Sequence, residues 1–457
     1  MRIGVDGFNL ALARGTGVAT YARSLISACS SLGYGIDLIY GLNVPATCPP
    51  EQRETLFFSA LAEEGRSEGQ PRRQSWIGMA RARMISRGAR DLVQVPASGR
   101  VIRKAMASFV PDSDRLFTFP GLFRVGERYL RRYGTLLPVR MPNPPPVMHW
   151  TYPVPVRIIG SRNVYTIHDL VPLRLPFLSL ENKRYHEQLL RACIAESSHI
   201  MTVSETSRAD ILRYLPVGTD KVSNCYQALR DDGGYRWEPD EAGQILRNLF
   251  GLEPQGYFLF FGAIEPKKNV GRLLEAYLSS PLETPLVLAG PEGWSAGAEL
   301  RFLDAPASQG GRTERVRRLG YLSADHLALL VASAKAVAFP SLYEGFGLPA
   351  LEAMAAGVPV IAGAEGSLPE ILDGAGLLVD PYDVRSIRAA LIEMDGDADL
   401  REQLCEAGRE RARAFTMERF SDSMAIFHRQ LLGAGARNEG PHESHLPSRT
   451  SFTGETM

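Results

Sequence analysis

The sequence has few cysteines, and they are far apart. None of the five has a partner at a paired spacing: Cys29, Cys48, Cys193, Cys225 and Cys405. This spacing excludes a disulfide framework and a zinc site made of closely spaced thiolates. The cysteine usage is typical of a reducing compartment.

Long apolar runs are also lacking. No run approaches the roughly 18–20 residues that cross a bilayer as a helix, and residues 1–6 read as a strand and not as a signal peptide. We therefore expect a cytoplasmic protein that is soluble or peripheral on the inner face of the cytoplasmic membrane.

A net charge is missing as well, because 51 Lys and Arg balance 51 Asp and Glu. Only residues 71–140 depart from this balance, with 15 Lys or Arg against 4 Asp or Glu, a surplus of 11. Arginine is interleaved there with apolar and aromatic residues, which suits an anionic membrane surface, a lipid diphosphate or a charged polysaccharide. Ordinary helices with solvated arginines have the same pattern. No motif in the segment favours nucleic acid.

The clearest motif is residues 339–357, FPSLYEGFGLPALEAMAAG. An apolar run before it, 332–339, predicts a buried strand. Gly345 and Gly347 predict a turn, and Pro349 suits the first turn of the helix that follows. Glu344 therefore precedes the turn, and Glu352 lies about one turn inside the helix.

A glycine turn that leads into a helix N-terminus is suited to binding an anion. The backbone N–H groups of Phe346, Gly347 and Leu348 would face a phosphate, whereas Glu344 and Glu352 suit neutral hydroxyls as acceptors. A ligand with phosphates and two sets of hydroxyls is a nucleotide-sugar. The alternative is an ordinary loop of an α/β protein with two solvated glutamates.

The motif resembles the signature of retaining glycosyltransferases of family 4, which have the two-domain GT-B fold. The flanking segments 317–323, 357–362 and 367–372 agree with it. The resemblance covers most of the C-terminal half and is weaker in the N-terminal half. It implies an α/β fold in which two Rossmann-like, doubly wound domains face a cleft.

The resemblance also implies domain boundaries. Residues 1–235 would form the acceptor-side domain, with a basic insertion at about 66–140. Residues 250–414 would bind the nucleotide-sugar, and 415–432 would form a helix that crosses back to the first domain. Segment 231–240 reads as the linker, and the polar tail 433–457 as disordered.

By the resemblance, Glu344 contacts the sugar hydroxyls, Glu352 the ribose, and Lys268 the diphosphate. Gly262 begins the loop that contains Lys268. The family usually has an arginine at the position of Ala263, and in this chain Lys267 would supply the missing positive charge. Family members that lack this arginine often use GDP-mannose in surface-polysaccharide assembly. The implied donor-binding residues are Glu352, Lys267, Gly262, Gly345, Phe346, Gly347, Leu348 and Tyr321. Tyr321 belongs to segment 318–323, whose backbone groups would contact the nucleobase.

The first domain supplies the remaining candidates. Residues 163–169 predict a strand that ends at His168 and Asp169, where ligands of parallel sheets bind. The resemblance makes both catalytic, together with Glu344 and Lys268, with His168 donating to a sugar hydroxyl. His149 is a weaker candidate. Gly15 and Gly17 would lie across the cleft beside the phosphates or the acceptor.

The sequence thus predicts a retaining transfer of mannose from GDP-mannose to a glycan or polyprenyl-diphosphate-linked acceptor, without a metal or other cofactor. The leaving phosphate would take the acceptor proton, although Glu344 as a covalent nucleophile stays open. A sugar-nucleotide 2-epimerase of the same fold is one alternative and would lack an acceptor region. A non-catalytic binding protein is another and would be expected to lose Glu344, Glu352 or Lys268.

Overall fold

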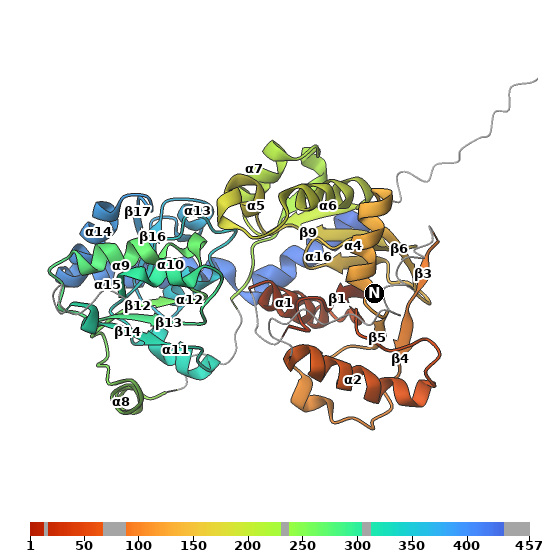
Figure 1. Ribbon diagram of the computed structural model, residues 1–457, viewed down its shortest axis with the longest axis horizontal. Coiled ribbons are helices and arrows are strands. Elements are labelled where there is room, and N and C mark those ends of the chain that lie inside the picture. The colour runs from red at the N-terminus through yellow and green to blue at the C-terminus, as the bar shows by residue number, and fades with distance from the viewer. Residues whose placement is uncertain (13–16, 67–87, 230–236, 304–311, 434–457) are drawn as a thin grey trace, which may run out of the picture.

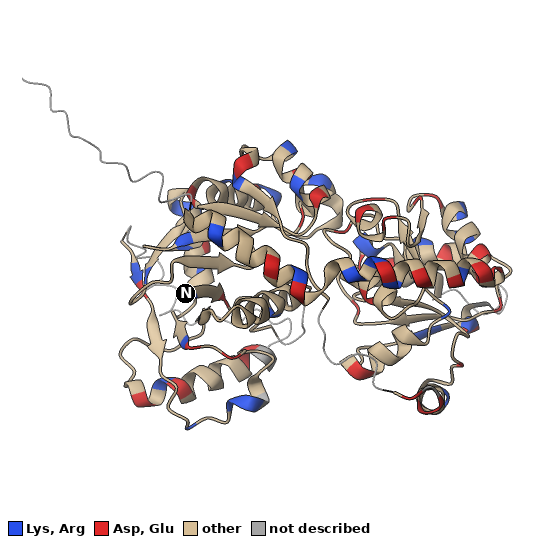
Figure 2. Cartoon of the chain, turned by 180° about the vertical axis from the view of Figure 1, so that it is seen from behind, with Lys and Arg blue, Asp and Glu red and all other residues tan. Residues whose placement is uncertain are grey.

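The computed structural model describes residues 1–12, 17–66, 88–229, 237–303 and 312–433. These residues form two lobes, each a parallel sheet with helices on both faces (Figure 1). In Figure 2 the charged residues lie mainly on helices and loops, while most of the strand residues are uncharged. The predicted α/β class with two doubly wound domains is confirmed.

The first lobe contains an eight-stranded sheet in which each strand pair is parallel except β4–β5. Its strands, in spatial order, are β11 (Val222–Asn224), β10 (His199–Thr202), β9 (Arg162–Thr166), β7 (Val147–Trp150), β1 (Arg2–Asp6), β2 (Gly35–Tyr40), β5 (Arg115–Thr118) and β4 (Val93–Val95).

Helices cover both faces of this sheet. They are α1 (Gly17–Ser31), α2 (Pro50–Arg66), α4 (Leu122–Tyr133), α5 (Val171–Arg174), α6 (Lys183–Glu196) and α7 (Glu205–Tyr214), and a small sheet of β3 (Arg90–Asp91), β6 (Leu137–Arg140) and β8 (Val156–Ile158) lies beside them. Successive strand residues face opposite sides, so Leu38 packs in the apolar cluster of α1 and Ile39 in that of α6. This double burial explains why the strands read as continuous apolar runs.

The described part of the basic segment belongs to the body of the first lobe. Strand β5 lies between β2 and β4 in the main sheet, and the rings of Phe117 and Tyr129 are buried. The segment that we expected to form a basic insertion at about 66–140 therefore supplies, where it is described, elements of the domain core. Residues 67–87 lie outside the described residues.

The second lobe has a six-stranded parallel sheet. Its order is β14 (Val316–Leu319), β13 (Leu286–Ala289), β12 (Phe258–Phe261), β15 (Ala336–Phe339), β16 (Val360–Gly363) and β17 (Leu377–Val379). The chain builds outward from β12 through β13 to β14, then returns to the other side of β12 with β15. This reversal between β12 and β15 is a topological switch point, where open parallel sheets bind their ligands.

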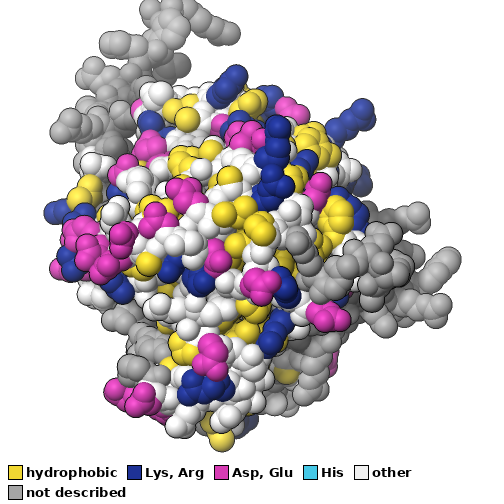
Figure 3. All heavy atoms as spheres, turned by 90° about the vertical axis from the view of Figure 1, so that its left-hand side faces the viewer, with side chains coloured by type: hydrophobic (Ala, Val, Ile, Leu, Met, Phe, Trp, Pro, Cys, Tyr) yellow, Lys and Arg dark blue, Asp and Glu magenta, His cyan; other side chains and the backbone are white. Residues whose placement is uncertain are grey.

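The helices of the second lobe are α9 (Val270–Leu278), α10 (Ala296–Leu300), α11 (Ala324–Ala332), α12 (Leu348–Ala355), α13 (Leu368–Leu372), α14 (Val384–Gly396) and α15 (Ala398–Ala412). The predicted linker 231–240 is only partly described. Its last residues begin a helix, α8 (Pro239–Ile245), because Pro239 suits a first helical turn. Figure 3 shows charges of both signs interspersed on the outer end of this lobe.

The last described helix, α16 (Met417–Gly433), runs back from the second lobe and packs against α1 of the first (Figure 1). Met424, Phe427 and His428 of α16 are buried. Residues 434–457, expected to form a disordered tail, lie outside the described residues. Among the helices that the structure describes, none combines the length and apolarity needed to cross a membrane.

Candidate functional site

Two loops meet at the switch point of the second lobe. One follows β12 and contains Gly262 and Lys268, and the other follows β15 and contains Glu344 and Gly347. Gly262 has a positive φ of 128°, and a Cβ at the neighbouring Gly290 would lie 2.1 Å from its carbonyl oxygen. The backbones can approach this closely because Gly290 lacks a side chain, whereas Gly262 is suited by its positive φ.

The two loops are joined by an ion pair between Lys268 and Glu344. Lys268 Nζ lies 2.6 Å from Glu344 Oε1, and the side chains are only 13% and 12% exposed. Burial alone would raise the pKa of Glu344, but the charges of Lys268 and Lys267 outweigh it and hold that pKa below its ordinary value. Glu344 is therefore an ionised hydrogen-bond acceptor at neutral pH.

Lys267 adds a second ammonium beside this pair. Its Nζ lies 3.5 Å from Glu265 Oε1. Burial would lower the pKa of Lys267, but the carboxylates of Glu344, Asp169 and Glu265 together raise it above the ordinary value. Both lysines thus bring positive charge to the carboxyl end of the sheet.

Helix α12 begins directly behind this pair. Gly347 caps its N-terminus with a φ of 101°, and a Cβ there would lie 2.7 Å from Leu368 Cδ2. Gly345 and Phe346 are buried, and Leu348 is half-buried. Glu352 is exposed on the second turn of the helix, as the sequence predicts.

The first lobe presents His168 and Asp169 just after β9. His168 Nε2 lies 2.8 Å from the Thr151 carbonyl oxygen, which can only accept, so this nitrogen carries the proton. Its Nδ1 lies 3.4 Å from Gln227 Nε2. Burial lowers the pKa of His168, which leaves the ring neutral at neutral pH.

The lobes are in direct contact at Gly345. The Ser204 hydroxyl donates to the Gly345 carbonyl at 2.7 Å. The single hydroxyl proton of Ser207 is shared between the His168 carbonyl at 2.8 Å and the Gly345 carbonyl at 3.2 Å. A Cβ at Gly345 would lie 2.5 Å from the His168 carbonyl oxygen. A side chain at this position would therefore push the two lobes apart.

A second contact joins α7 to the other lobe. Glu370 accepts hydrogen bonds from the backbone N–H groups of Glu205 and Thr206, at 2.7 and 2.9 Å, and from the Tyr226 hydroxyl at 2.7 Å. A carboxylate at a helix N-terminus satisfies otherwise unpaired donors and the positive end of the helix dipole. The Glu370 carboxylate therefore holds the two lobes in one arrangement.

A cavity of about 340 Å³ lies between the lobes. The first lobe contributes Val18, Tyr152, His168, Asp169, Glu181 and His186 to its wall, and the second contributes Glu265, Lys267 and Trp294. The structure therefore brings Lys267 to the same space as His168 and Asp169, from which it is about 100 residues away in the sequence. Gly17 starts α1 beside Val18, whereas Gly15 lies outside the described residues.

Two sequence candidates lie elsewhere. Tyr321 is 68% exposed beyond β14 and does not line the cavity. His149 is fully buried under α16, with its Nε2 2.8 Å from His428 Nε2, so it packs α16 against the first-lobe sheet and does not line the cavity.

Sequence reasoning missed Tyr152, Glu181, His186, Glu265 and Trp294 in the cavity wall. Residues 179–198 have the apolar spacing of an amphipathic helix, and no motif within them points to Glu181 or His186. Asp6 was missed too. It accepts hydrogen bonds from the backbone N–H groups of Phe8 and Thr151, and burial raises its pKa to about 6.

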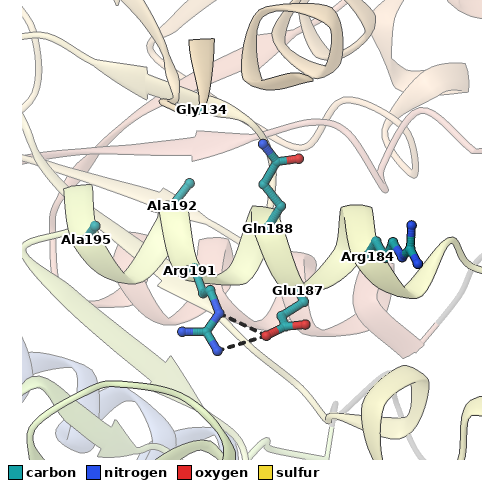
Figure 4. A pocket seen from close by; sticks show the side chains of 7 residues that line it. All are labelled: Gly134, Arg184, Glu187, Gln188, Arg191, Ala192 and Ala195. Atoms are coloured by element: carbon teal, nitrogen blue, oxygen red, sulfur yellow. Dashed lines mark hydrogen bonds and ion pairs between the residues drawn. The ribbon is translucent and has the colours of Figure 1, made fainter. Parts of the chain in front are cut away.

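Another cavity, of about 400 Å³, lies along the outer side of α6 (Figure 4). Glu187 and Arg191 point toward each other there and form an ion pair at 2.8 Å between positions one helical turn apart. Such exposed pairs add little stability. Among the described residues, no group of three or more metal-binding side chains is found.

Comparison with known proteins agrees with this geometry. The family of glycosyl transferases group 1 matches residues 246–411. O-antigen chain mannosyltransferase B of Escherichia coli is 36% identical over 263 residues, which cover 56% of this chain and 68% of that protein. The serotype-specific mannosyltransferase WbdA of Escherichia coli is 30% identical over 251 residues, 53% of this chain and 30% of that protein.

Solved structures show the same fold. Sucrose-phosphate synthase from Thermosynechococcus elongatus aligns with a TM-score of 0.64 at 20% identity, covering 95% of this chain and 100% of that one. WaaG, a glycosyltransferase involved in lipopolysaccharide biosynthesis, aligns with a TM-score of 0.59 at 17% identity, covering 93% and 99%.

The two facing lobes and the switch-point site define a glycosyltransferase of the GT-B type. More particularly, the chain belongs to the family of glycosyl transferases group 1.

Proposed function

We propose that this glycosyltransferase moves mannose from GDP-mannose to a glycan acceptor in the assembly of a surface polysaccharide, with retention of anomeric configuration. The observation that carries the proposal is the convergence of Lys267, Lys268 and the α12 N-terminus at the switch point. The similarity to mannosyltransferases of O-antigen synthesis supports the choice of sugar.

The diphosphate of the donor would lie over the α12 N-terminus, where backbone N–H groups and the helix dipole favour an anion. Lys268 would keep one N–H group on Glu344 and donate another to the departing diphosphate as negative charge builds on it, because an ammonium has three donors. Donors that are already in place stabilise this charge without reorganisation, which is the largest single source of catalysis in many enzymes. No step requires a metal or other cofactor.

The ion pair also bears on how configuration is retained. Glu344 is held by Lys268 at 2.6 Å, and a charge-assisted hydrogen bond of this kind lowers the nucleophilicity of a carboxylate. This arrangement favours Glu344 as an acceptor for sugar hydroxyls. The acceptor would then attack from the face that the diphosphate leaves, and the leaving phosphate would take its proton.

The role of His168 differs in detail from the expected one. Since its Nε2–H is donated to the Thr151 carbonyl, His168 has no ring proton left to donate to a sugar hydroxyl. Its Nδ1 would accept a hydrogen bond from such a hydroxyl in place of the Gln227 amide, which lies 3.4 Å away. Glu352 would bind the ribose hydroxyls from the exposed side of α12.

The location of the protein is a further part of the proposal. The basic segment 71–140 would attach the enzyme to the anionic inner face of the cytoplasmic membrane, close to a polyprenyl-diphosphate-linked glycan. Several of its arginines are already used in ion pairs, including Arg103 with Glu54 and Arg115 with Asp37. Sedimentation with anionic vesicles tests the attachment, and a protein that stays in the supernatant at low salt would refute it.

Thermal unfolding of the full chain against GDP, UDP and ADP tests the function itself. A ligand that binds only the folded state raises the midpoint by mass action. We expect GDP to give the largest shift and GDP-mannose to be the sugar nucleotide that is turned over. If none of the three nucleotides shifts the midpoint, the nucleotide-sugar proposal is wrong.

A further inference from the structure

One wall of the interlobe cavity holds a second, independent polar cluster. Glu181 accepts a hydrogen bond from the Tyr152 hydroxyl at 3.1 Å on one oxygen and from His186 Nδ1 at 2.7 Å on the other. All three residues line the cavity and belong to the first lobe. Lys267, from the second lobe, lines the same cavity.

His186 is the deepest member of this cluster. It is 6% exposed, and its Nε2 has no hydrogen-bond partner among the residues that the structure describes. A buried polar atom without a partner costs free energy unless something satisfies it. Because the ring lines the cavity, a hydroxyl of a bound molecule can supply the missing bond.

The charge of the cavity selects the kind of molecule. The charged side chains in its described wall are the carboxylates Asp169, Glu181 and Glu265 and one ammonium, Lys267. The hydrogen bond from His186 holds the pKa of Glu181 below its ordinary value, although burial opposes this, so Glu181 is ionised at neutral pH. The nearby Lys183 donates to the Ser179 carbonyl and does not line the cavity.

A phosphate that entered this part of the cavity would face more carboxylates than cations. Neutral hydroxyls would instead find strong acceptors in the same carboxylates. The wall also offers apolar surface from Val18, Pro153 and Trp294. Leu180, which also lines the cavity, is largely exposed, at 75%. Apolar faces with a few convergent polar groups are typical of sites that bind a sugar ring.

We propose that Tyr152, Glu181 and His186 form the acceptor subsite, which binds the hydroxyls of a neutral terminal sugar and rejects a terminal sugar that carries a phosphate. This inference rests on the proposed function and deepens it, because it assigns the acceptor side of the same cavity. The cluster shares that cavity with Lys267, so a bound sugar would lie next to the departing diphosphate.

Steady-state kinetics of the full chain test the subsite, with GDP-mannose as donor and methyl α-mannoside or its 6-phosphate as acceptor. The wild type is expected to prefer the neutral sugar. Glu181→Gln should raise the KM for methyl α-mannoside about 10-fold, as expected for the loss of one charged hydrogen bond. The variant should also show a smaller preference for methyl α-mannoside over its 6-phosphate, and its affinity for GDP should not change.

Two further variants make the result specific. Tyr152→Phe removes one hydroxyl and should raise the same KM by a smaller factor, so it serves if Glu181→Gln does not fold. Glu187→Gln is the matched control, because this glutamate follows His186 on α6 but lies in the outer cavity of Figure 4, paired with Arg191. Its KM should equal that of the wild type.

The outcomes separate the two proposals. If GDP binds normally but neither Glu181→Gln nor Tyr152→Phe changes the KM, the subsite is wrong and the proposed function stands. Equal use of the phosphorylated sugar by the wild type, or transfer to neither sugar while GDP binds, also overturns the subsite. A wild type that binds no nucleotide overturns the proposed function before any variant is made.

Discussion

The ion pair between Lys268 and Glu344 leads to the sharpest prediction. Lys268→Ala removes an ammonium that touches Glu344 at 2.6 Å and that would stabilise the departing diphosphate. We expect kcat to fall roughly 10²- to 10³-fold, the effect of losing one donor to a developing negative charge. The affinity for GDP should fall less, because the backbone of α12 and Lys267 still bind the phosphates.

The same change should also destabilise the fold. It leaves Glu344 largely buried without its closest counter-charge, and burial is the largest influence on its pKa. Breaking a buried ion pair costs about 3–5 kcal/mol. Because Lys267 still attracts Glu344, we expect about 3 kcal/mol, or about 6–12 °C in the unfolding midpoint of a domain of this size.

A matched control separates catalysis from stability. Lys335 pairs with Asp395 at the same 2.6 Å and with similar burial, at 18% and 26% exposed. It precedes β15 and therefore lies at the opposite, amino-terminal end of the sheet. Lys335→Ala should lower the unfolding midpoint but leave kcat within about twofold of the wild type, since it touches nothing in the proposed reaction.

The assay is transfer to methyl α-mannoside measured well below both unfolding midpoints. A Lys268→Ala enzyme with a near-normal kcat would refute the leaving-group role. Equal losses of kcat in Lys268→Ala and Lys335→Ala would show that instability, and not the loss of a donor, explains the effect.

Three other variants test separate parts of the structure. Glu352→Ala should weaken GDP binding about 10- to 100-fold, as expected for charged hydrogen bonds to ribose hydroxyls, and an unchanged affinity by calorimetry would remove the ribose assignment. Glu370→Ala should lower the free energy of unfolding by at least about 2 kcal/mol, because the backbone N–H group of Thr206 at the α7 N-terminus loses its carboxylate acceptor from the other lobe. If thermal unfolding shows no loss of stability, this contact does not hold the lobes together. Burial lowers the pKa values of both His149 and His428, the latter to about 4. The unfolded chain therefore binds these protons more readily, and stability should fall as pH drops from 6.5 toward about 4. His428→Gln should flatten that slope in thermal unfolding across the same window, and a slope equal to that of the wild type would contradict the assignment.

Much of the local structure follows from the sequence alone. The apolar run before Pro340 and the glycines after it predict a strand and a turn, and the strand is found at Ala336–Phe339 with α12 directly behind the turn. Residues 2–6 form β1 as expected. Short-range rules suffice there, because strand burial, turn glycines and a helix-starting proline act within a few residues of each other.

The proximity of distant groups could not be predicted from these rules. The pairing of Lys268 with Glu344 depends on β12 and β15 being neighbours, and this order is a property of the whole sheet. Glu181 and His186 read as part of an ordinary amphipathic helix, since nothing near them in sequence shows that Lys267 lies across a cavity from them. Sheet order and lobe packing are decided by burial across the entire chain.

The sequence by itself therefore determined the class of fold, the strand–turn–helix unit that would bind a phosphate, and the carboxylates on either side of it. Those features are encoded in contiguous residues. The tertiary structure decided which charges pair, which tautomer His168 adopts, and which acceptor groups line the cavity. These depend on contacts between residues far apart in the chain, whose geometry no local pattern records.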